Sequence, residues 1–182
     1  MSNEVVAAPA ATLLTVGDAS SSIFSGSLTG PLALKKTGAG VLELSGSNSN
    51  TGATTVSGGT LDVSGTLTAT TGVTVNTGGT LLLSGASGEQ VSDTATVGLG
   101  GGTLAFNHAT NQIETLGALT LSVNSTLDFN DQHLVINGAS DLVHQLFGKE
   151  GDGWHARSAL GFASLPTGPA AEVEAIFEIK GT

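Results

Sequence analysis

Short apolar segments with a two-residue alternation recur through the first two-thirds of the chain. Leucine and valine alternate with polar residues in segments such as VLELSG (41–46), TLDVSG (60–65) and TLLLSG (80–85). Each segment ends at Ser-Gly, where the backbone turns at little steric cost. No window in this region carries a sustained period of 3.6 residues. The pattern therefore predicts short β-strands separated by tight turns.

The predicted strands repeat at a nearly constant spacing. The phrase GGTLDVSG (58–65) returns as GGTLLLSG (78–85), as GGTLAFN (101–107) and, in weaker form, as NSTLDFN (124–130). Such a repeat is typical of a β-solenoid, in which each coil stacks on the one before it. We expect two neighbouring inward ladders of side chains. These are Leu61, Leu81, Leu104 and Leu127 in the first ladder, and Val63, Leu83, Phe106 and Phe129 in the second.

Composition agrees with stacked strands. The 182 residues include 27 glycines, and only 11% are charged, which is low against a typical share of about 25%. The net charge is −10 with five basic residues, so the chain cannot neutralise many phosphates, and neither nucleic acid nor an anionic membrane surface is an expected partner. No segment reaches transmembrane length.

The search for chemical motifs predicts no cofactor and no metal site. The chain has no cysteine, which excludes disulfides and cysteine-based metal sites or nucleophiles. His133, His144 and His155 fall on separate predicted elements, whereas a zinc site needs three or four convergent ligands. Surface or capping roles are the simpler interpretation of these histidines.

Three parts are predicted along the chain: a flexible N-terminal arm (1–11), a solenoid (12–130) and a tail of different texture (131–182). In the tail, SDLVHQLFGKEG (140–151) has a cap-capable serine and a helical apolar stripe. Two strand-like segments follow at 155–165 and 171–180. The predicted fold class is therefore an all-β parallel solenoid with short coils, followed by a small α+β unit of one helix and a β-hairpin. That unit is a candidate cap for the C-terminal end of the solenoid.

The stretch from Leu28 to Gly65 resembles the autotransporter-associated β-strand repeats of bacterial surface proteins. The family pattern is a K-x-G-x-G turn, L-x-L-S-G, N-x-x-x-G-x-T-x-V and G-G-T-L. The matching residues are Lys36, Gly38, Gly40, Leu42, Leu44, Ser45, Gly46, Asn48 (or Asn50), Gly52, Thr54, Val56 and Gly59 to Leu61. The resemblance implies a right-handed β-solenoid on the cell exterior that acts as a stalk or display surface.

The tail resembles the C-terminal part of the RidA (YjgF) family of enamine/imine deaminases, through the words NGASDLV, LFG, HARSALG, ASLP and EVEAIFEI (residues 129–181). The resemblance implies that Arg157 grips the carboxylate of a small 2-imino acid and that Glu172 positions or activates water. Arg157 is the only arginine of the chain, and a guanidinium clamps a carboxylate well. The alternative is an exposed cross-strand pair without catalytic function. The N-terminal half of that family has no counterpart in this chain.

Three functions remain open at this point. The first is a structural or interaction protein whose partners are other copies of itself or neighbouring surface components. The second is a deaminase that uses Arg157 and Glu172, and the third is a self-assembling filament subunit, since stacked coils propagate when neither end is blunted. The N-terminus does not read as a signal peptide as it stands, because it has no basic region and Glu4 and Pro9 interrupt the apolar run. The first function places the protein outside the cell after removal of a signal, and the second places it in the cytoplasm.

Overall fold

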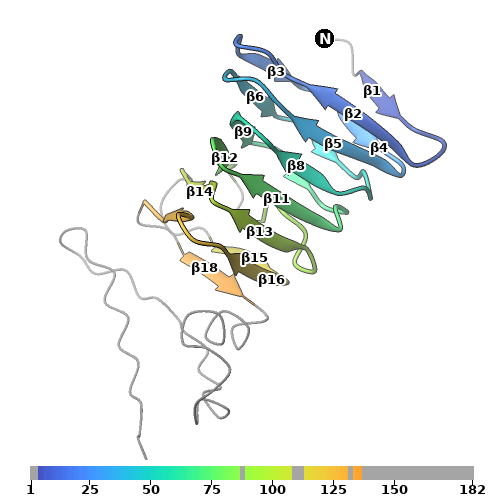
Figure 1. Cartoon of the computed structure of the whole chain (residues 1–182). Coiled ribbons are helices and arrows are strands. Elements are labelled where there is room, and N and C mark those ends of the chain that lie inside the picture. Colours follow the sequence, from blue (N-terminus) through green and yellow to red (C-terminus); the bar gives the residue numbers. More distant parts are fainter. Residues whose placement is uncertain (1–3, 87–88, 108–112, 131–132, 137–182) are drawn as a thin grey trace, which may run out of the picture.

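The chain winds into a parallel β-solenoid of six coils (Figure 1). The computed structural model describes residues 4–86, 89–107, 113–130 and 133–136, the last four through their backbone. Within these residues every regular element is a strand, and every pairing between two strands is parallel. The all-β solenoid predicted from the alternation is confirmed. The right-handed winding that the resemblance implies stays a prediction.

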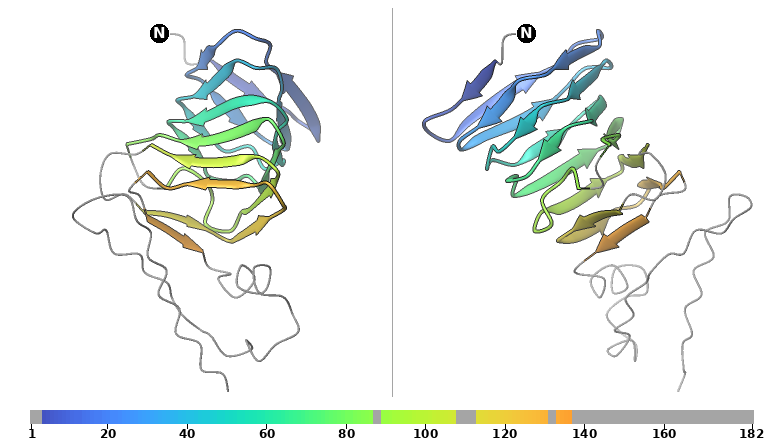
Figure 2. Two further views of the ribbon diagram at one scale, coloured as in Figure 1. Left: turned by 60° about the vertical axis from the view of Figure 1, so that its left-hand side comes forward. Right: turned by 180° about the vertical axis from the view of Figure 1, so that it is seen from behind.

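Two six-stranded sheets form two faces of the solenoid, and each coil contributes one strand to each of them (Figure 2). Sheet 1 contains β2 (Thr12–Val16), β5 (Leu32–Lys36), β8 (Thr54–Val56), β11 (Gly72–Asn76), β13 (Thr96–Gly100) and β16 (Ala118–Leu121). Sheet 2 contains β3 (Ser22–Phe24), β6 (Val41–Leu44), β9 (Gly59–Val63), β12 (Gly79–Leu83), β14 (Thr103–Phe106) and β17 (Thr126–Asp128). Strands of one coil follow each other in the chain, so neighbours in a sheet are one coil apart.

The third face is built from shorter strands with an interrupted ladder. Its strands are β1 (Val5–Ala7), β4 (Ser27–Thr29), β7 (Ser47–Asn48), β10 (Thr66–Leu67), β15 (Ile113–Leu116) and β18 (His133–Ile136). The pairs are β1 with β4, β7 with β10, and β15 with β18. A single bridge joins Leu67 to Val91 in the fifth coil. Side chains therefore take over some of the pairing that backbone groups provide on the other two faces.

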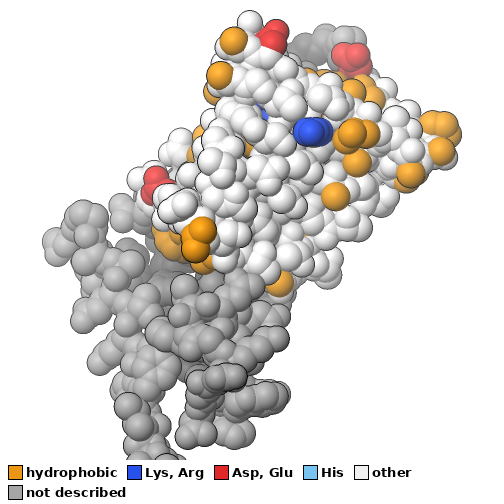
Figure 3. All heavy atoms as spheres, in the orientation of Figure 1, with side chains coloured by type: hydrophobic (Ala, Val, Ile, Leu, Met, Phe, Trp, Pro, Cys, Tyr) orange, Lys and Arg blue, Asp and Glu red, His pale blue; other side chains and the backbone are white. Residues whose placement is uncertain are grey.

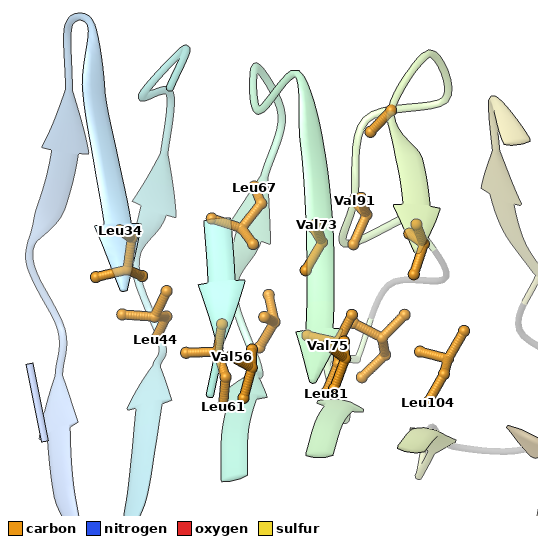
Figure 4. Packing of buried hydrophobic residues seen from close by; sticks show 14 of the residues in the cluster. Leu34, Leu44, Val56, Leu61, Leu67, Val73, Val75, Leu81, Val91 and Leu104 are labelled. Carbon is orange, nitrogen blue, oxygen red and sulfur yellow. The ribbon is translucent and has the colours of Figure 1, made fainter. Parts of the chain in front are cut away.

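The first predicted ladder forms as expected. In sheet 2, Leu81 lies in register with Leu61 on one side and with Leu104 on the other, and Leu104 lies in register with Leu127. Leu61, Leu81 and Leu104 are fully buried, and Figure 4 shows them stacked from coil to coil along the core. Burying one such side chain stabilises the fold by about 1.5–3 kcal/mol, so the ladder is a major source of stability.

The second predicted ladder also forms. Leu83 lies in register with Val63 and with Phe106. Phe129 extends the ladder by one coil, because its ring stacks on that of Phe106 with centroids 5.6 Å apart and planes 8° from parallel. The core is thus a set of continuous rows parallel to the solenoid axis.

One corner of the solenoid requires glycine in successive coils. A Cβ atom at Gly46 would lie 1.8 Å from the carbonyl oxygen of Gly26, and one at Gly65 would lie 2.1 Å from that of Gly46. No side chain fits at such distances. The Ser-Gly endings at residues 45–46 and 64–65 therefore reflect how closely the backbones of neighbouring coils approach at this corner.

The limits of the solenoid differ from those predicted at both ends. Residues 5–7, expected in a flexible arm (1–11), form β1 and pair in parallel with β4. At the other end, β18 pairs with β15, so the coils continue to residue 136 instead of ending at residue 130. Neither strand carries the repeated phrase from which the coils were predicted. The predicted helix (140–151) and hairpin lie outside the described residues.

Candidate functional site

Arg157 and Glu172, the two predicted catalytic residues, lie outside the described residues, so the deaminase hypothesis stays a prediction. The candidate site that the described residues offer lies in the solenoid. It consists of three polar side chains turned into the core, one hollow on the third face and one row of carboxylates on the outside of sheet 2.

Lys36 ends β5 with its side chain inside the solenoid. Only 1% of the residue is exposed. Its ammonium donates to the carbonyl oxygens of Thr37 (2.7 Å), Gly38 (3.1 Å) and Gly58 (3.1 Å). Burial lowers the pKa of Lys36, and the charge of Asp18 partly offsets this effect. The lysine of the K-x-G-x-G turn thus ties two successive corners together, because Gly58 belongs to the next coil.

Asn48 performs a similar task on the third face. It is fully buried, and its Oδ1 accepts a hydrogen bond from the backbone N–H of Leu28 at 3.0 Å. Its Nδ2 donates to the carbonyl oxygens of Gly46 and Thr66, both at 3.0 Å. One side chain therefore links three coils and satisfies backbone groups that the short strands leave unpaired.

Glu114 is a buried carboxylate at the point where the third face is interrupted. It is fully buried on β15, and its two oxygens accept hydrogen bonds from the backbone N–H groups of Gln90 (2.8 Å) and Val91 (2.7 Å). The pKa of Glu114 is raised to about 8. Burial is the largest cause, the charges of Glu89 and Asp93 act in the same direction, and the two N–H groups act in the opposite one. The carboxylate replaces a missing strand pair between the fifth and sixth coils.

A hollow of about 300 Å³ opens beside this carboxylate, lined by Thr68, Glu89, Val91, Ser92 and Asp93. Glu89 makes the reciprocal contact to β15, because its carboxylate accepts the backbone N–H (3.2 Å) and the hydroxyl (3.0 Å) of Thr115. The carboxylate of Glu89 thus joins the segment 89–93 to the next coil.

On the outside of sheet 2, carboxylates of one coil bind serine hydroxyls of the next. Ser64 donates to Glu43 at 2.6 Å, and Ser84 donates to Asp62. Glu43 and Asp62 lie in register on neighbouring strands. Burial raises the pKa of Asp62; the bond from Ser84 lowers it, and the charge of Glu43 raises it further. These pairs tie coils together at an open surface, and nothing in their setting resembles an enclosed reaction site.

The polar side chains described above therefore all hold neighbouring coils together. Among the residues that the structure describes, no group of three or more His, Cys, Asp or Glu side chains is placed to hold a metal ion. In the same part of the chain, no helix has the length and apolar character needed to span a bilayer.

Of the three buried polar side chains, sequence reasoning identified two and missed the third. Lys36 and Asn48 were found as parts of the repeat pattern, although their burial was not predicted. Glu114 was missed. It stands two residues before the buried Leu116, so the alternation of the strand places it inward, and an acidic residue at an inward position was the available signal.

Comparison with known proteins supports the repeat. The family model described as "Passenger-associated-transport-repeat" matches residues 34–63, a span that contains both Lys36 and Asn48. A protein named "Protein TCP17", from Trypanosoma cruzi, is 44% identical over 70 residues, which cover 38% of this chain and 43% of that protein. The chain therefore spans less than half the length of this relative. No solved structure matches the chain, and neither match supports the deaminase-like segment.

Proposed function

We propose that this protein is a structural repeat protein that serves as a stalk or display scaffold on the outside of the cell. The observation that carries the proposal is the run of in-register ladders through all six coils, in a chain whose residues 34–63 match a passenger-associated repeat. Such a stack is quasi-one-dimensional, since each coil contacts only its neighbours. It suits a protein that must extend from a surface.

The polar groups of the core support the same function. Lys36, Asn48 and Glu114 each bridge neighbouring coils, and all three are buried. They fix the register between coils, because a slip by one residue would leave an ammonium, an amide or a carboxylate buried without its partners. A scaffold gains from this fixed register, which keeps the outer faces regular along the axis.

The experiment is to locate the protein in its own cells. Antibodies against the folded solenoid should label intact cells, and external protease should remove that signal without loss of a cytoplasmic marker. Labelling that appears only after the cells are permeabilised would contradict the proposal. A variant with Gly46→Ala and Gly65→Ala, which disrupts the stacked corner, serves as the control for whether display requires the folded solenoid.

A further inference from the structure

Residues 89–93, here called the strap, lie in the third face between β10 and β15. On the side of β10 the strap is held by backbone groups, and the N–H of Leu67 donates to the carbonyl oxygen of Gln90 at 2.5 Å. On the side of β15 it is held through two carboxylates, that of Glu114 on β15 and that of Glu89 on the strap itself. The attachment of the strap to the sixth coil therefore depends on groups that can gain and lose protons.

Negative charge gathers around the strap. Glu89 and Asp93 lie on it, and Glu114 faces it from β15. Charged side chains are otherwise sparse on the solenoid, and the face in view in Figure 3 is largely uncharged. The two lysines that the structure describes, Lys35 and Lys36, both lie in β5 of the second coil. Repulsion among the three carboxyls is therefore relieved most directly by a proton.

The elements on either side favour the same state of Glu114. β10 contains no titratable residue, and β18 places Leu134 in register with Glu114 and His133 in register with Ile113. Burial, together with the two acidic residues of the strap, raises the pKa of Glu114 to about 8, although the two N–H groups act in the opposite direction. While the strap is in place, Glu114 therefore holds its proton at neutral pH.

The hollow of about 300 Å³ lies along the strap and is lined by four of its residues together with Thr68 of the fourth coil. Glu89 and Asp93 are exposed, whereas Gln90 and Val91 are buried, with exposed fractions of 0% and 2%. The strap is thus a short segment with solvent on one side and the core on the other. Segments of this kind open locally at a lower cost in free energy than the sheets beneath them.

We propose that the strap is a pH-controlled closure of the third face, which a proton on Glu114 locks and the loss of that proton allows to open while sheets 1 and 2 stay folded. Opening exposes Glu114 to water, so its pKa returns towards the ordinary value of 4.5. Between 4.5 and 8 the closed state holds a proton that the open state has released. The equilibrium constant for opening should therefore rise about tenfold per pH unit in this window and level off above it. The open state presents the edges of β10 and β15 to solvent.

The test measures how fast a buried thiol on the strap becomes accessible. The chain has no cysteine, so Val91→Cys in the full chain introduces a single thiol and leaves the backbone N–H that binds Glu114. Its labelling by a methanethiosulfonate reagent is followed from pH 5 to pH 9. At each pH the rate in concentrated urea is divided by the rate in buffer, which removes the ionisation of the thiol itself. This protection ratio should fall about tenfold per pH unit up to pH 8 and then become constant.

Val75→Cys is the matched control for local opening. Val75 is fully buried in β11 of sheet 1, so its thiol reacts when the sheet itself unfolds. Its protection ratio should be much higher than that of Val91→Cys at every pH, and low concentrations of urea should reduce it. The ratio of Val91→Cys should change little in the same urea, because local opening exposes little surface. Equal protection at the two positions would overturn the proposal, since the strap would then open only with the whole fold.

Two further variants in the Val91→Cys background identify the group that titrates. With Glu114→Gln the protection ratio should no longer depend on pH. Asp93→Asn should keep the slope but reach the plateau at a lower pH, because the charge of Asp93 raises the pKa of Glu114. A slope that persists in Glu114→Gln would assign the titration to another group, such as His133, and would overturn the proposal. If Glu114→Gln does not fold, an unchanged plateau in Asp93→Asn has the same consequence. None of these results bears on the scaffold function, which rests on the stacking of the coils.

Discussion

At the scale of the single residue, Lys36 gives the sharpest test of how the coils are held together. Lys36→Met keeps the length of the side chain but leaves the carbonyl oxygens of Thr37, Gly38 and Gly58 without their donor. We expect the free energy of unfolding to fall by about 1–3 kcal/mol, because three partly buried carbonyl groups lose their hydrogen bonds to a charged donor. The measurement is the midpoint of urea unfolding.

The neighbouring residue provides the control for this prediction. Lys35 lies next to Lys36 on the same strand but is half-buried on the outward side of sheet 1. Lys35→Met makes the same chemical change outside the core and should shift the midpoint by much less. Equal shifts in the two variants would mean that the contacts of Lys36 contribute nothing particular to stability.

Glu114 predicts a dependence of stability on pH. The pKa of this carboxyl is raised from 4.5 to about 8 in the folded protein. Between these values the folded state holds a proton that the unfolded state has released, so stability falls as pH rises through this window and levels off above it. For a fully protonated folded group the slope is about 1.4 kcal/mol per pH unit. Unfolding midpoints measured from pH 4 to pH 9 give the profile.

Two variants isolate the contribution of Glu114 from that of other carboxyls. Glu114→Gln cannot titrate, so its profile should be flatter than that of the natural chain between pH 4.5 and pH 8. Glu89→Gln changes a neighbouring carboxylate that binds Thr115 at an exposed position. This variant should keep the slope but end the window at a lower pH, because the charge of Glu89 raises the pKa of Glu114. If Glu114→Gln retains the full slope, the titration belongs to another group.

Lys36 and Glu114, two ionisable side chains of the core, show what sequence can reveal at this scale. Lys36 is part of a recognisable pattern, yet the pattern does not say that its ammonium is enclosed by carbonyls from two coils. That information depends on the distance between corners, which only the folded backbone defines. Glu114 stands out by the alternation of its strand, but its partners, Gln90 and Val91, lie in a segment without any alternation.

At the scale of the strand, the long faces were predictable and the third face was not. Strands of sheets 1 and 2 mostly have four or five residues, enough for an inward and outward alternation, and the expected ladders of Leu61 and Val63 formed. β7 and β10 have two residues each, too few to show a period. Their pairing follows from the stacking of the neighbouring sheets and from Asn48, so it is a consequence of tertiary structure.

The stacked corner leads to a prediction about glycine. Gly46→Ala would place a Cβ atom 1.8 Å from the carbonyl oxygen of Gly26, so neighbouring coils must separate. We expect destabilisation by more than about 1 kcal/mol, beyond the usual effect of glycine on the unfolded chain. The midpoint of urea unfolding measures it.

Gly98→Ala is the matched control for the corner. Gly98 lies within β13, and a Cβ there would meet first the side-chain oxygen of Thr120 at 3.1 Å, a group that can rotate away. This variant should be nearly as stable as the natural chain. Comparable losses in both variants would show that glycine acts through chain flexibility and not through the close approach of backbones.

At the scale of the whole molecule, a solenoid must deal with two open ends. Each coil of a solenoid is satisfied by its neighbours, so the terminal coils depend on whatever covers them. In the first coil, β1, β2 and β3 contain no charged residue, and Glu4 lines the cavity beside them. The C-terminal end leads into residues 137–182, a length that corresponds to about two coils of the repeat and that the sequence predicts to be a different unit.

The last prediction concerns that C-terminal segment as a cap. Leu121, Leu127 and Phe129 pack against the core from the last full coil and remain partly exposed, and β16, β17 and β18 stand at sheet edges. Deleting residues 139–182 should expose these edges. The truncated protein should then aggregate or assemble end to end, seen by light scattering and electron microscopy. Replacing the segment with a Gly/Ser linker of equal length separates loss of cover from loss of chain length. A truncated protein that is soluble, no larger than the natural chain and equally stable would show that this segment is not a cap.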